Sequence, residues 1–268
     1  MNPDAPPFQR LSRQGRFPAL IVCDHASCLV PERLHDLGLG PQDLQRHIGW
    51  DIGASRLAHG LAQRLDLSLV AAGFSRLVVD CNRHLDEPSS IVTVSDETPI
   101  PGNQRLGRDE RQRRARDYFE PYHGAIDQQM AELRQRCEAP ALVAIHSFTP
   151  AMHGMARPWH CGILWDRDPR MPVPLLQELA MEDGLVVGDN EPYSGRHPED
   201  YTIERHAESF GWPHVCIEVR QDLLLDNQAI EDWTERLARA LEPLLSQRSL
   251  YRVGEPYRPV RQVRGVHT

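Results

Sequence analysis

Histidine and carboxylate side chains offer the clearest chemistry in this sequence. His25, His146 and Glu218 each lie at the end of, or just inside, a short apolar run that is typical of a buried β-strand. Two neutral imidazoles and one carboxylate can hold Zn²⁺ and leave a fourth position open for water. A glutamate whose pKa is raised by burial can act as a general base toward that water. Taken singly, either histidine is more often a hydrogen-bonded core residue than a metal ligand. Because both lie at the ends of predicted strands, the metal-ligand role becomes a comparable possibility for the pair.

Two of these assignments have alternatives. The third metal ligand has three candidates, which are Asp24, Glu32 and Asp51. Asp51 lies where a loop turns into a predicted helix, so the N-cap of that helix is an equally good role for it. Glu218 has two interpretations of equal weight: the general base, or half of a buried ion pair with Arg220 or another arginine.

All 30 basic residues are arginines, so the chain contains no lysine. A Schiff-base lysine and a phosphate-loop lysine are therefore excluded, and proton transfer falls to His, Asp, Glu, Tyr or Cys. Arg76, Asn82 and Arg83 flank the end of one predicted strand, where arginine forks can bind carboxylates. A formal net charge of −8 argues against nucleic acid as the main partner. Recognition by arginines inside an acidic protein fits a small dianionic ligand better than a polyanion.

The elements that must position these residues alternate between strands and helices. Strands are predicted over 18–24, 67–72, 75–81, 141–146, 161–165, 185–187 and 214–219, and helices over 52–65, 106–138, 174–182, 201–210 and 229–245. This order predicts a single α/β domain over 1–268, with a core at about 18–245 and a mixed, mostly parallel sheet covered by helices on both faces. Ligands of such sheets bind beyond the carboxyl ends of the strands, where the candidate residues lie.

The remaining segments give weaker expectations. Residues 99–103, 153–160 and 189–195 are predicted rim loops, the arginines of 108–116 a solvated helix face, and 251–268 an extended tail. There is no apolar run of about 18 residues and no secretory signal, so we expect neither a membrane span nor export. The six cysteines form no Cys-x-x-Cys pair, which favours reduced thiols and a cytoplasmic location.

Seven segments of the chain, in order between about residues 18 and 245, resemble the N-formylglutamate amidohydrolases. They are DHAS (24–27), HIGWDIGA (47–54), SRLVVDCNR (75–83), SDETPIPGN (95–103), IHSFTP (145–150), GDNEPYSG (188–195) and IEVRQD (217–222). That family is similar in fold to the zinc carboxypeptidases, which have a phosphorylase/hydrolase-like fold, and to the succinylglutamate and aspartoacyl deacylases.

The resemblance implies a role for individual residues. His146 looks like the late histidine ligand of zinc carboxypeptidases and Glu218 like their general base and proton shuttle. The pair Asn82 and Arg83 looks like their clamp for a substrate carboxylate. Further implied roles are carbonyl polarisation by Arg76 and carboxylate binding by Arg157. The wider clan uses His-x-x-Glu for its first two ligands, but here Cys28 follows His25 at that spacing. Either Asp51 or Cys28 must then be the third ligand, and the family pattern, which keeps an aspartate there, favours Asp51.

The implied activity is the zinc-dependent hydrolysis of a linear amide in a small N-acyl acidic amino acid. N-formylglutamate, cleaved to glutamate and formate during histidine degradation, is the substrate that the resemblance suggests. One alternative is that the same zinc site acts on another N-acyl amino acid or a small peptide. Another is a protein that binds a metal or ligand without turnover, and retention of Glu218 beside both histidines speaks against it. The oligomeric state is not predicted.

Overall fold

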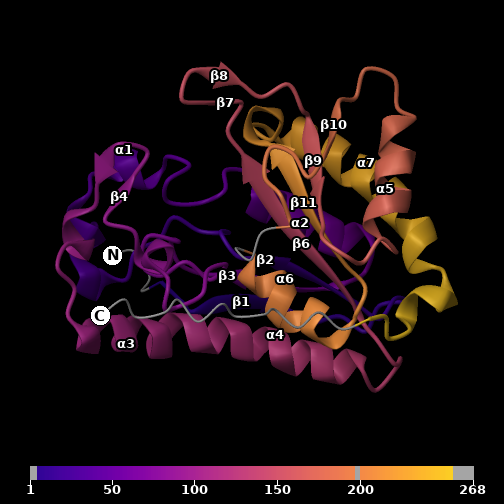
Figure 1. Cartoon of the computed structure of the whole chain (residues 1–268), viewed down its shortest axis with the longest axis horizontal. Coiled ribbons are helices and arrows are strands. Elements are labelled where there is room, and N and C mark those ends of the chain that lie inside the picture. Colours follow the sequence, from indigo (N-terminus) through magenta and orange to yellow (C-terminus); the bar gives the residue numbers. More distant parts are fainter. Residues whose placement is uncertain (1–4, 197–199, 256–268) are drawn as a thin grey trace, which may run out of the picture.

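A seven-stranded sheet forms the centre of the computed structural model, which describes residues 5–196 and 200–255 (Figure 1). The strand order is β1-β3-β2-β6-β11-β9-β10. Its members are β1 (Phe8–Leu11), β2 (Ala19–Cys23), β3 (Ser68–Ala72), β6 (Ala141–Phe148), β9 (Cys161–Leu164), β10 (Val187–Asp189) and β11 (His214–Arg220). The four central strands β3, β2, β6 and β11 are parallel, whereas β1 and β9 pair antiparallel with β3 and β11. The sheet is therefore mixed and mostly parallel, as predicted.

Helices cover both faces of the sheet because successive strand residues point to opposite sides. Ile21, Val143 and Ile217 pack toward α2 (Ala54–Arg64), α5 (Pro172–Ala180) and α7 (Asn227–Leu245). Leu20, Val22 and Leu142 pack on the other face, toward α4 (Glu120–Leu133) and α6 (Tyr201–His206). The remaining elements are α1 (Pro41–Leu44), α3 (Arg108–Arg114) and the hairpins β4 (Val94–Ser95) with β5 (Thr98–Pro99) and β7 (Ala151–Met152) with β8 (Met155–Ala156). The chain is a single α/β domain.

The predicted strand over 75–81 is wrong, because this segment is a series of turns. Both edges of β3, the strand before it, are already paired with β1 and β2, so the next residues have no strand to join. Their backbone groups bond to loops instead: Ser75 N donates to Leu29 O (2.7 Å) and Arg76 N donates to Gly49 O (3.2 Å). The apolar side chains of the segment are nevertheless buried, which explains the strand-like pattern.

The edge strand β1 lies in the polar N-terminal segment, where no strand was predicted. It pairs with β3 alone and is only partly buried, so its sequence FQRL needs no continuous apolar run. Its residues still point alternately to the two faces of the sheet, and Phe8 packs against the core on the face covered by α4 and α6.

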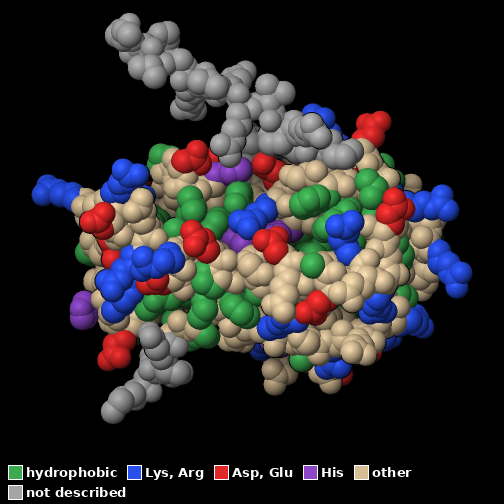
Figure 2. Space-filling model, turned by 90° about the horizontal axis from the view of Figure 1, so that it is seen from below, with side chains coloured by type: hydrophobic (Ala, Val, Ile, Leu, Met, Phe, Trp, Pro, Cys, Tyr) green, Lys and Arg blue, Asp and Glu red, His purple; other side chains and the backbone are tan. Residues whose placement is uncertain are grey.

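The long predicted helix over 106–138 is present as α3, a π-helical segment (Ala115–Phe119) and α4. The wider π turn ends two residues before Pro121, which lacks an N–H and whose ring would clash with the carbonyl four residues earlier in a regular α-helix. On the face seen in Figure 2, acidic and basic side chains are interspersed.

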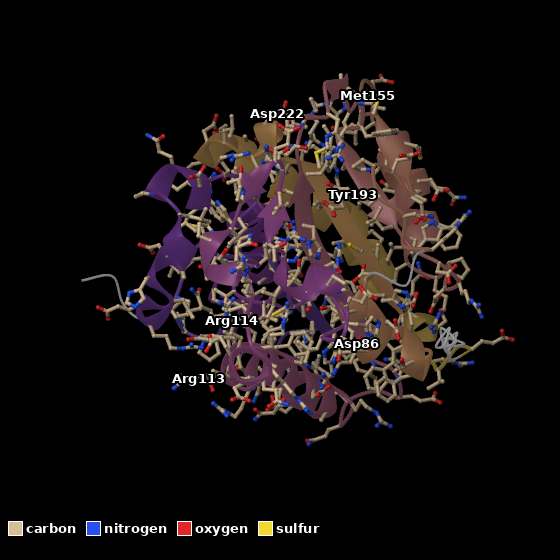
Figure 3. All side chains as sticks on the ribbon, turned by 60° about the vertical axis from the view of Figure 1, so that its left-hand side comes forward. Asp86, Arg113, Arg114, Met155, Tyr193 and Asp222 are labelled. Atoms are coloured by element: carbon tan, nitrogen blue, oxygen red, sulfur yellow. The ribbon has the colours of Figure 1, made fainter. Side chains whose placement is uncertain are left out.

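The prediction of a solvated arginine face along this helix is wrong at Arg114. Arg113 points outward and is exposed, but Arg114 points into the molecule and is 1 % exposed (Figure 3). Its guanidinium donates to Val78 O (3.0 Å), Asn103 Oδ1 (2.7 Å) and Gly102 O (3.2 Å). The buried side chain of Arg114 therefore joins the segment 75–81 to the segment 101–103.

Two further expectations concern the cysteines and the tail. All six cysteines are free thiols. Most of the predicted tail, 256–268, lies outside the described residues. In the part of the chain that the structure describes, no helix has the length and apolar character needed to cross a bilayer.

Candidate functional site

The site lies at the carboxyl ends of the central parallel strands, on the side of the sheet covered by α4 and α6. His146 of β6 and Glu218 of β11 are direct partners in the strand register, so their side chains point to the same face. Asp24 and His25 directly follow β2, the neighbour of β6 on its other side. Three adjacent strands thus deliver polar side chains to one edge, as their positions in the sequence predicted.

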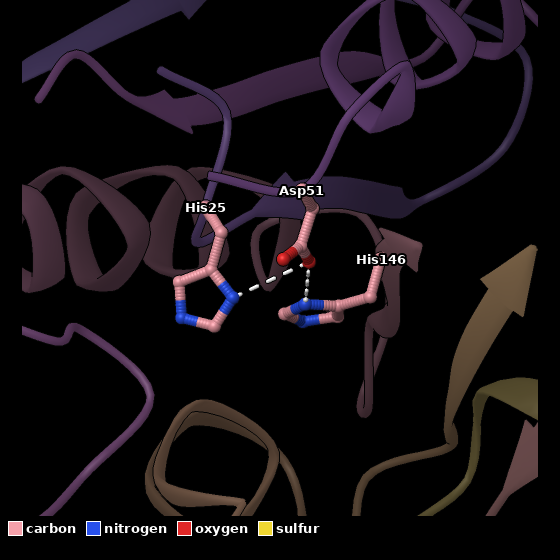
Figure 4. A group of neighbouring side chains, drawn as sticks. All are labelled: His25, Asp51 and His146. Carbon is pink, nitrogen blue, oxygen red and sulfur yellow. Dashed lines mark hydrogen bonds and ion pairs between the residues drawn. The ribbon is translucent and has the colours of Figure 1, made fainter. Parts of the chain in front are cut away.

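His25, Asp51 and His146 form a buried cluster (Figure 4). Asp51 Oδ2 lies 2.8 Å from His146 Nδ1 and 3.3 Å from His25 Nδ1. One donor atom from each of the three residues can be chosen so that all lie within 4.8 Å of one another. Ligands of a tetrahedral zinc ion are about 3.3 Å apart, given metal–ligand distances of about 2.0 Å.

Backbone geometry aims Asp51 at the histidines. Its amide donates to His25 O (2.9 Å), and Gly53 follows with φ +84°, a conformation that glycine adopts without strain. A Cβ atom at Gly53 would lie 2.4 Å from Leu224 Cβ, so no larger residue fits this turn. The N-cap interpretation of Asp51 is wrong, because Gly53 is the residue at the N-cap of α2 and the Asp51 carboxylate faces the two imidazoles.

The other proposed third ligands lie elsewhere. Neither the half-buried thiol of Cys28 nor the exposed Glu32 belongs to the cluster. Asp24 contacts the opposite side of the His146 ring, where His146 Nε2 donates to Asp24 Oδ2 (3.1 Å). Among the described residues, Asp51 is therefore the carboxylate that meets both Nδ1 atoms.

Both imidazoles are held from behind by carboxylates. His25 Nε2 donates to Asp80 Oδ1 (2.8 Å), just as His146 Nε2 donates to Asp24. This arrangement fixes the ring orientation and leaves Nδ1 of each histidine directed at Asp51. It is the usual support of histidines that bind metals.

The two supporting carboxylates are themselves bound by several donors. Asp24 Oδ1 accepts hydrogen bonds from Tyr122 Oη of α4 (2.9 Å) and Thr202 Oγ1 of α6 (2.6 Å). Asp80 Oδ2 accepts from Arg76 Nε (3.0 Å) and Nη2 (2.7 Å). Such networks hold the imidazoles in place before any ligand binds.

Charge in the cluster is dominated by carboxylates. Burial raises the pKa of Asp24, but the hydrogen bond and charge of His146 outweigh it and lower that pKa to about 2. Burial would also raise the pKa of Asp80, but the charge of Arg76 and the charge and hydrogen bond of His25 outweigh it, so that this pKa falls well below its usual value. The pKa of His146 is raised well above its usual value, because its bonds to Asp24 and Asp51 outweigh burial. Two buried rings surrounded by three carboxylates form a site that favours positive charge.

This donor set fits a divalent metal ion. It offers two imidazole nitrogens and one carboxylate oxygen, which is a typical catalytic zinc set that leaves a position open. A dication would supply the positive charge that the three carboxylates favour. A further buried atom of the cavity, Glu218 Oε2, has no hydrogen-bond partner and can therefore accept a proton from a bound molecule.

Glu218 is 7 % exposed and has no arginine partner among the residues that the structure describes. Burial raises its pKa to about 7, with the charge of His146 opposing and that of Asp51 assisting. The interpretation as an ion pair with Arg220 is wrong, since Arg220 Nε donates to Asp222 Oδ1 (2.8 Å). A carboxylate with a pKa near neutrality can both take up and release a proton.

A cavity of about 420 Å³ opens over these residues, a size common for small-molecule sites. Its walls include His25, His47, Asp51, Arg76, Asn82, Arg83, His146, Tyr193, Asp200 and Glu218. Arg157 is not a lining residue. Its Nη1 donates to Thr149 Oγ1 (3.0 Å) and Tyr193 Oη (3.1 Å), so it stands behind Tyr193. Figure 3 shows Tyr193 below the hairpin whose tip carries Met155.

Several residues of the site were not identified from the sequence. Asp24 was considered only as a metal ligand, and Asp80, Tyr122 and Thr202 had no assigned role. The position of Asp24, two residues after Val22 on the same strand face, is a signal that could have paired it with His146. Tyr122 and Thr202 lie in helices, where nothing in the spacing marks them.

Comparison with known proteins identifies the family of the chain. The family model described as N-formylglutamate amidohydrolase matches residues 17–225. A crystal structure of a gene product from Agrobacterium tumefaciens is 34 % identical, with a TM-score of 0.84, covering 89 % of this chain and 94 % of that one. The N-formylglutamate amidohydrolase from Ralstonia eutropha is 22 % identical, with a TM-score of 0.70, covering 90 % and 97 %. No curated protein sequence matches. The chain belongs to the N-formylglutamate amidohydrolase family, a family of hydrolases.

Proposed function

We propose that the protein is a metal-dependent amidohydrolase that cleaves N-formylglutamate to glutamate and formate. The observation that carries this proposal is one cavity that holds both the His25–Asp51–His146 set and the unpartnered carboxylate of Glu218. The family to which the chain belongs suggests the substrate.

His25, Asp51 and His146 would hold the metal ion, which we take to be zinc because of the donor set. When bound, such an ion lowers the pKa of a water molecule and polarises a carbonyl oxygen. Asp24 and Asp80 keep the two imidazoles oriented for this role.

Glu218 moves the proton in this mechanism. Its Oε2 accepts a proton from the attacking water, and the same atom returns the proton to the nitrogen of the leaving amine. Burial holds its pKa near neutrality, which suits both steps. Arg76 lines the same cavity and is held rigidly by Asp80, so its guanidinium can stabilise the negative charge that develops on the carbonyl oxygen.

Asn82 and Arg83 would bind the carboxylates of the substrate. Asn82 Oδ1 accepts from Thr202 N (2.9 Å), so Nδ2 is the side-chain atom that can donate to a ligand. Both residues line the cavity. Arg157 would act through Tyr193, whose hydroxyl it contacts, rather than by touching the substrate.

The direct test is to measure bound metal and the release of formate from N-formylglutamate by the purified protein. We expect stoichiometric metal and turnover, and a loss of about 10²–10⁴-fold in kcat for Glu218→Gln. A panel with N-acetyl- and N-succinylglutamate checks the acyl group. A protein free of metal, or a Glu218→Gln variant with full activity, would refute the mechanism; turnover of another N-acyl amino acid alone would refute only the substrate.

A further inference from the structure

A second pair of histidines, outside the cavity, is buried between α4 and α6. His123 and His206 are 0 % and 1 % exposed, and His123 Nδ1 lies 2.8 Å from His206 Nε2. At one end, His123 Nε2 lies 3.0 Å from Cys81 O. At the other, His206 Nδ1 lies 2.9 Å from Asp127 Oδ1, which is at the surface. The four groups form one chain of contacts from solvent to the segment beside Asp80.

The number of ring protons in this chain of hydrogen-bonding groups follows from the two acceptors at its ends, the Cys81 carbonyl and the Asp127 carboxylate. The carbonyl of Cys81 can only accept, so His123 Nε2 carries a hydrogen. A neutral His123 then has a bare Nδ1, which must accept a hydrogen from His206 Nε2. An ionised Asp127 also only accepts, so His206 Nδ1 needs a hydrogen too. Three N–H groups are required, but two neutral imidazoles have only two. The complete chain therefore carries one extra proton, on His206.

The surroundings make this proton easy to lose. Burial lowers the pKa of His206 below its usual value, although the hydrogen bond and charge of Asp127 act to raise it. Burial and the neighbouring His206 lower the pKa of His123 to about 3, so His123 stays neutral. The charged and titratable groups that face the pair from the packed elements are Asp127 of α4, Arg205 and Tyr201 of α6, Tyr122 of α4 and Asp24 after β2.

We propose that His123 and His206 are positioning residues that form a proton-dependent link between α4, α6 and the segment carrying Asp80. Cys81 lies between Asp80, which orients His25, and Asn82, which accepts a hydrogen bond from α6. With the extra proton, every contact of the chain is a hydrogen bond. Without it, His206 Nδ1 and Asp127 Oδ1 face each other with no hydrogen between them, so this contact between α6 and α4 is lost while the His206–His123 and Arg205–Asp127 contacts remain. The link stands whether or not the proposed catalytic function does.

The experiment counts the protons directly. In histidine-labelled protein, ¹⁵N NMR of the ring nitrogens distinguishes protonated from bare positions. Between about pH 5 and about pH 8, we expect His206 to change from two N–H groups to one, while His123 keeps its single hydrogen on Nε2.

The isosteric variant Asp127→Asn is the decisive comparison. Its amide nitrogen can donate to a bare His206 Nδ1, so the chain is complete with two neutral rings and we expect the titration of His206 to disappear. Asp127 is half-exposed, so the substitution is tolerable. Arg205→Gln serves as a second variant: Arg205 Nη2 donates to Asp127 (3.0 Å) and its charge lowers the pKa of His206, so its removal should raise the pH at which His206 titrates.

Three results would overturn the proposal. They are a pair with the same number of N–H groups throughout the pH range, an Asp127→Asn variant that titrates as the wild type does, and an Arg205→Gln variant with an unchanged midpoint. Because turnover is not the readout, none of them depends on the substrate or on bound metal.

Discussion

At the scale of single residues, three buried carboxylates of the site have an oppositely charged or hydrogen-bonding partner, and a fourth, that of Glu218, does not. Asp24, Asp51 and Asp80 are buried, and each contacts an imidazole or an arginine. Glu218 Oε2 is buried beside them without a hydrogen-bond partner. A buried carboxylate without compensation destabilises the fold, so this residue should reveal itself in stability measurements as well as in turnover.

We predict that Glu218→Gln stabilises the protein at alkaline pH. The pKa of Glu218 is raised from 4.5 to about 7 by burial, so the folded protein holds the proton more tightly than the unfolded chain does. The favourable contribution of the protonated form is fully present below about pH 4.5 and is lost as the pH rises through about 7. Glutamine is neutral at every pH. In urea denaturation of metal-free protein, the gain should reach up to about 3 kcal/mol at pH 8 and be small at pH 5.

A control for this prediction is Glu235→Gln, which alters an exposed ion pair with Arg64 and should change stability by less than about 0.5 kcal/mol. Equal effects of Glu218→Gln at both pH values would contradict the raised pKa.

At the scale of elements, loops that lack regular structure depend on a few buried side chains. The segment 75–83 lines the cavity, and Arg114 of α3 bonds both to this segment and to the short 3-10 turn Pro101–Asn103. The sequence pattern placed 75–81 in a strand because this segment contains a short apolar run with β-branched residues. What it could not indicate is that both edges of β3 are occupied, since strand pairing is a property of the whole sheet.

We predict that Arg114→Met destabilises the protein by about 2–4 kcal/mol, because it leaves buried carbonyl and amide oxygens without donors. The neighbouring Arg113→Met is a matched control: it removes the same charge one residue away on the exposed side of α3, and should cost less than about 0.5 kcal/mol. Denaturant midpoints of both variants give the comparison. Similar losses in the two variants would show that charge, rather than the buried contacts, is responsible.

At the scale of the whole molecule, the proposed metal ligands His25, Asp51 and His146 come from segments that are distant in the chain. The four central strands β2, β3, β6 and β11 and the approach of the two imidazoles could be predicted, because a parallel sheet brings the carboxyl ends of its strands to one edge. The support of His25 by Asp80, and of Asp24 by Tyr122 and Thr202, could not. Those contacts depend on how loops and helices pack, and a polar residue in a helix has no spacing that reveals its partner.

We predict that metal binding stabilises the whole fold. Zinc at about 100 times its Kd should add about 2.7 kcal/mol, or roughly 5–10 °C in Tm for a chain of this size. Asp51→Asn should lose most of this shift, whereas Cys28→Ser, which changes the other residue proposed as third ligand, should retain it. Thermal melts with and without a chelator provide the measurement. A shift that is lost in Cys28→Ser and kept in Asp51→Asn would reverse the assignment.

The strand order also determines when the sheet can be completed during synthesis. In the finished sheet β11 lies between β6 and β9, yet both of these strands precede it in the chain. A chain made from its N-terminus therefore presents two open strand edges, on β6 and on β9, until residues 214–220 arrive to fill the gap. Open edges pair readily with other chains. The soluble fraction produced by translation in vitro should accordingly fall as the concentration of growing chains rises, and the cavity becomes complete only when this late strand, which carries Glu218, has inserted.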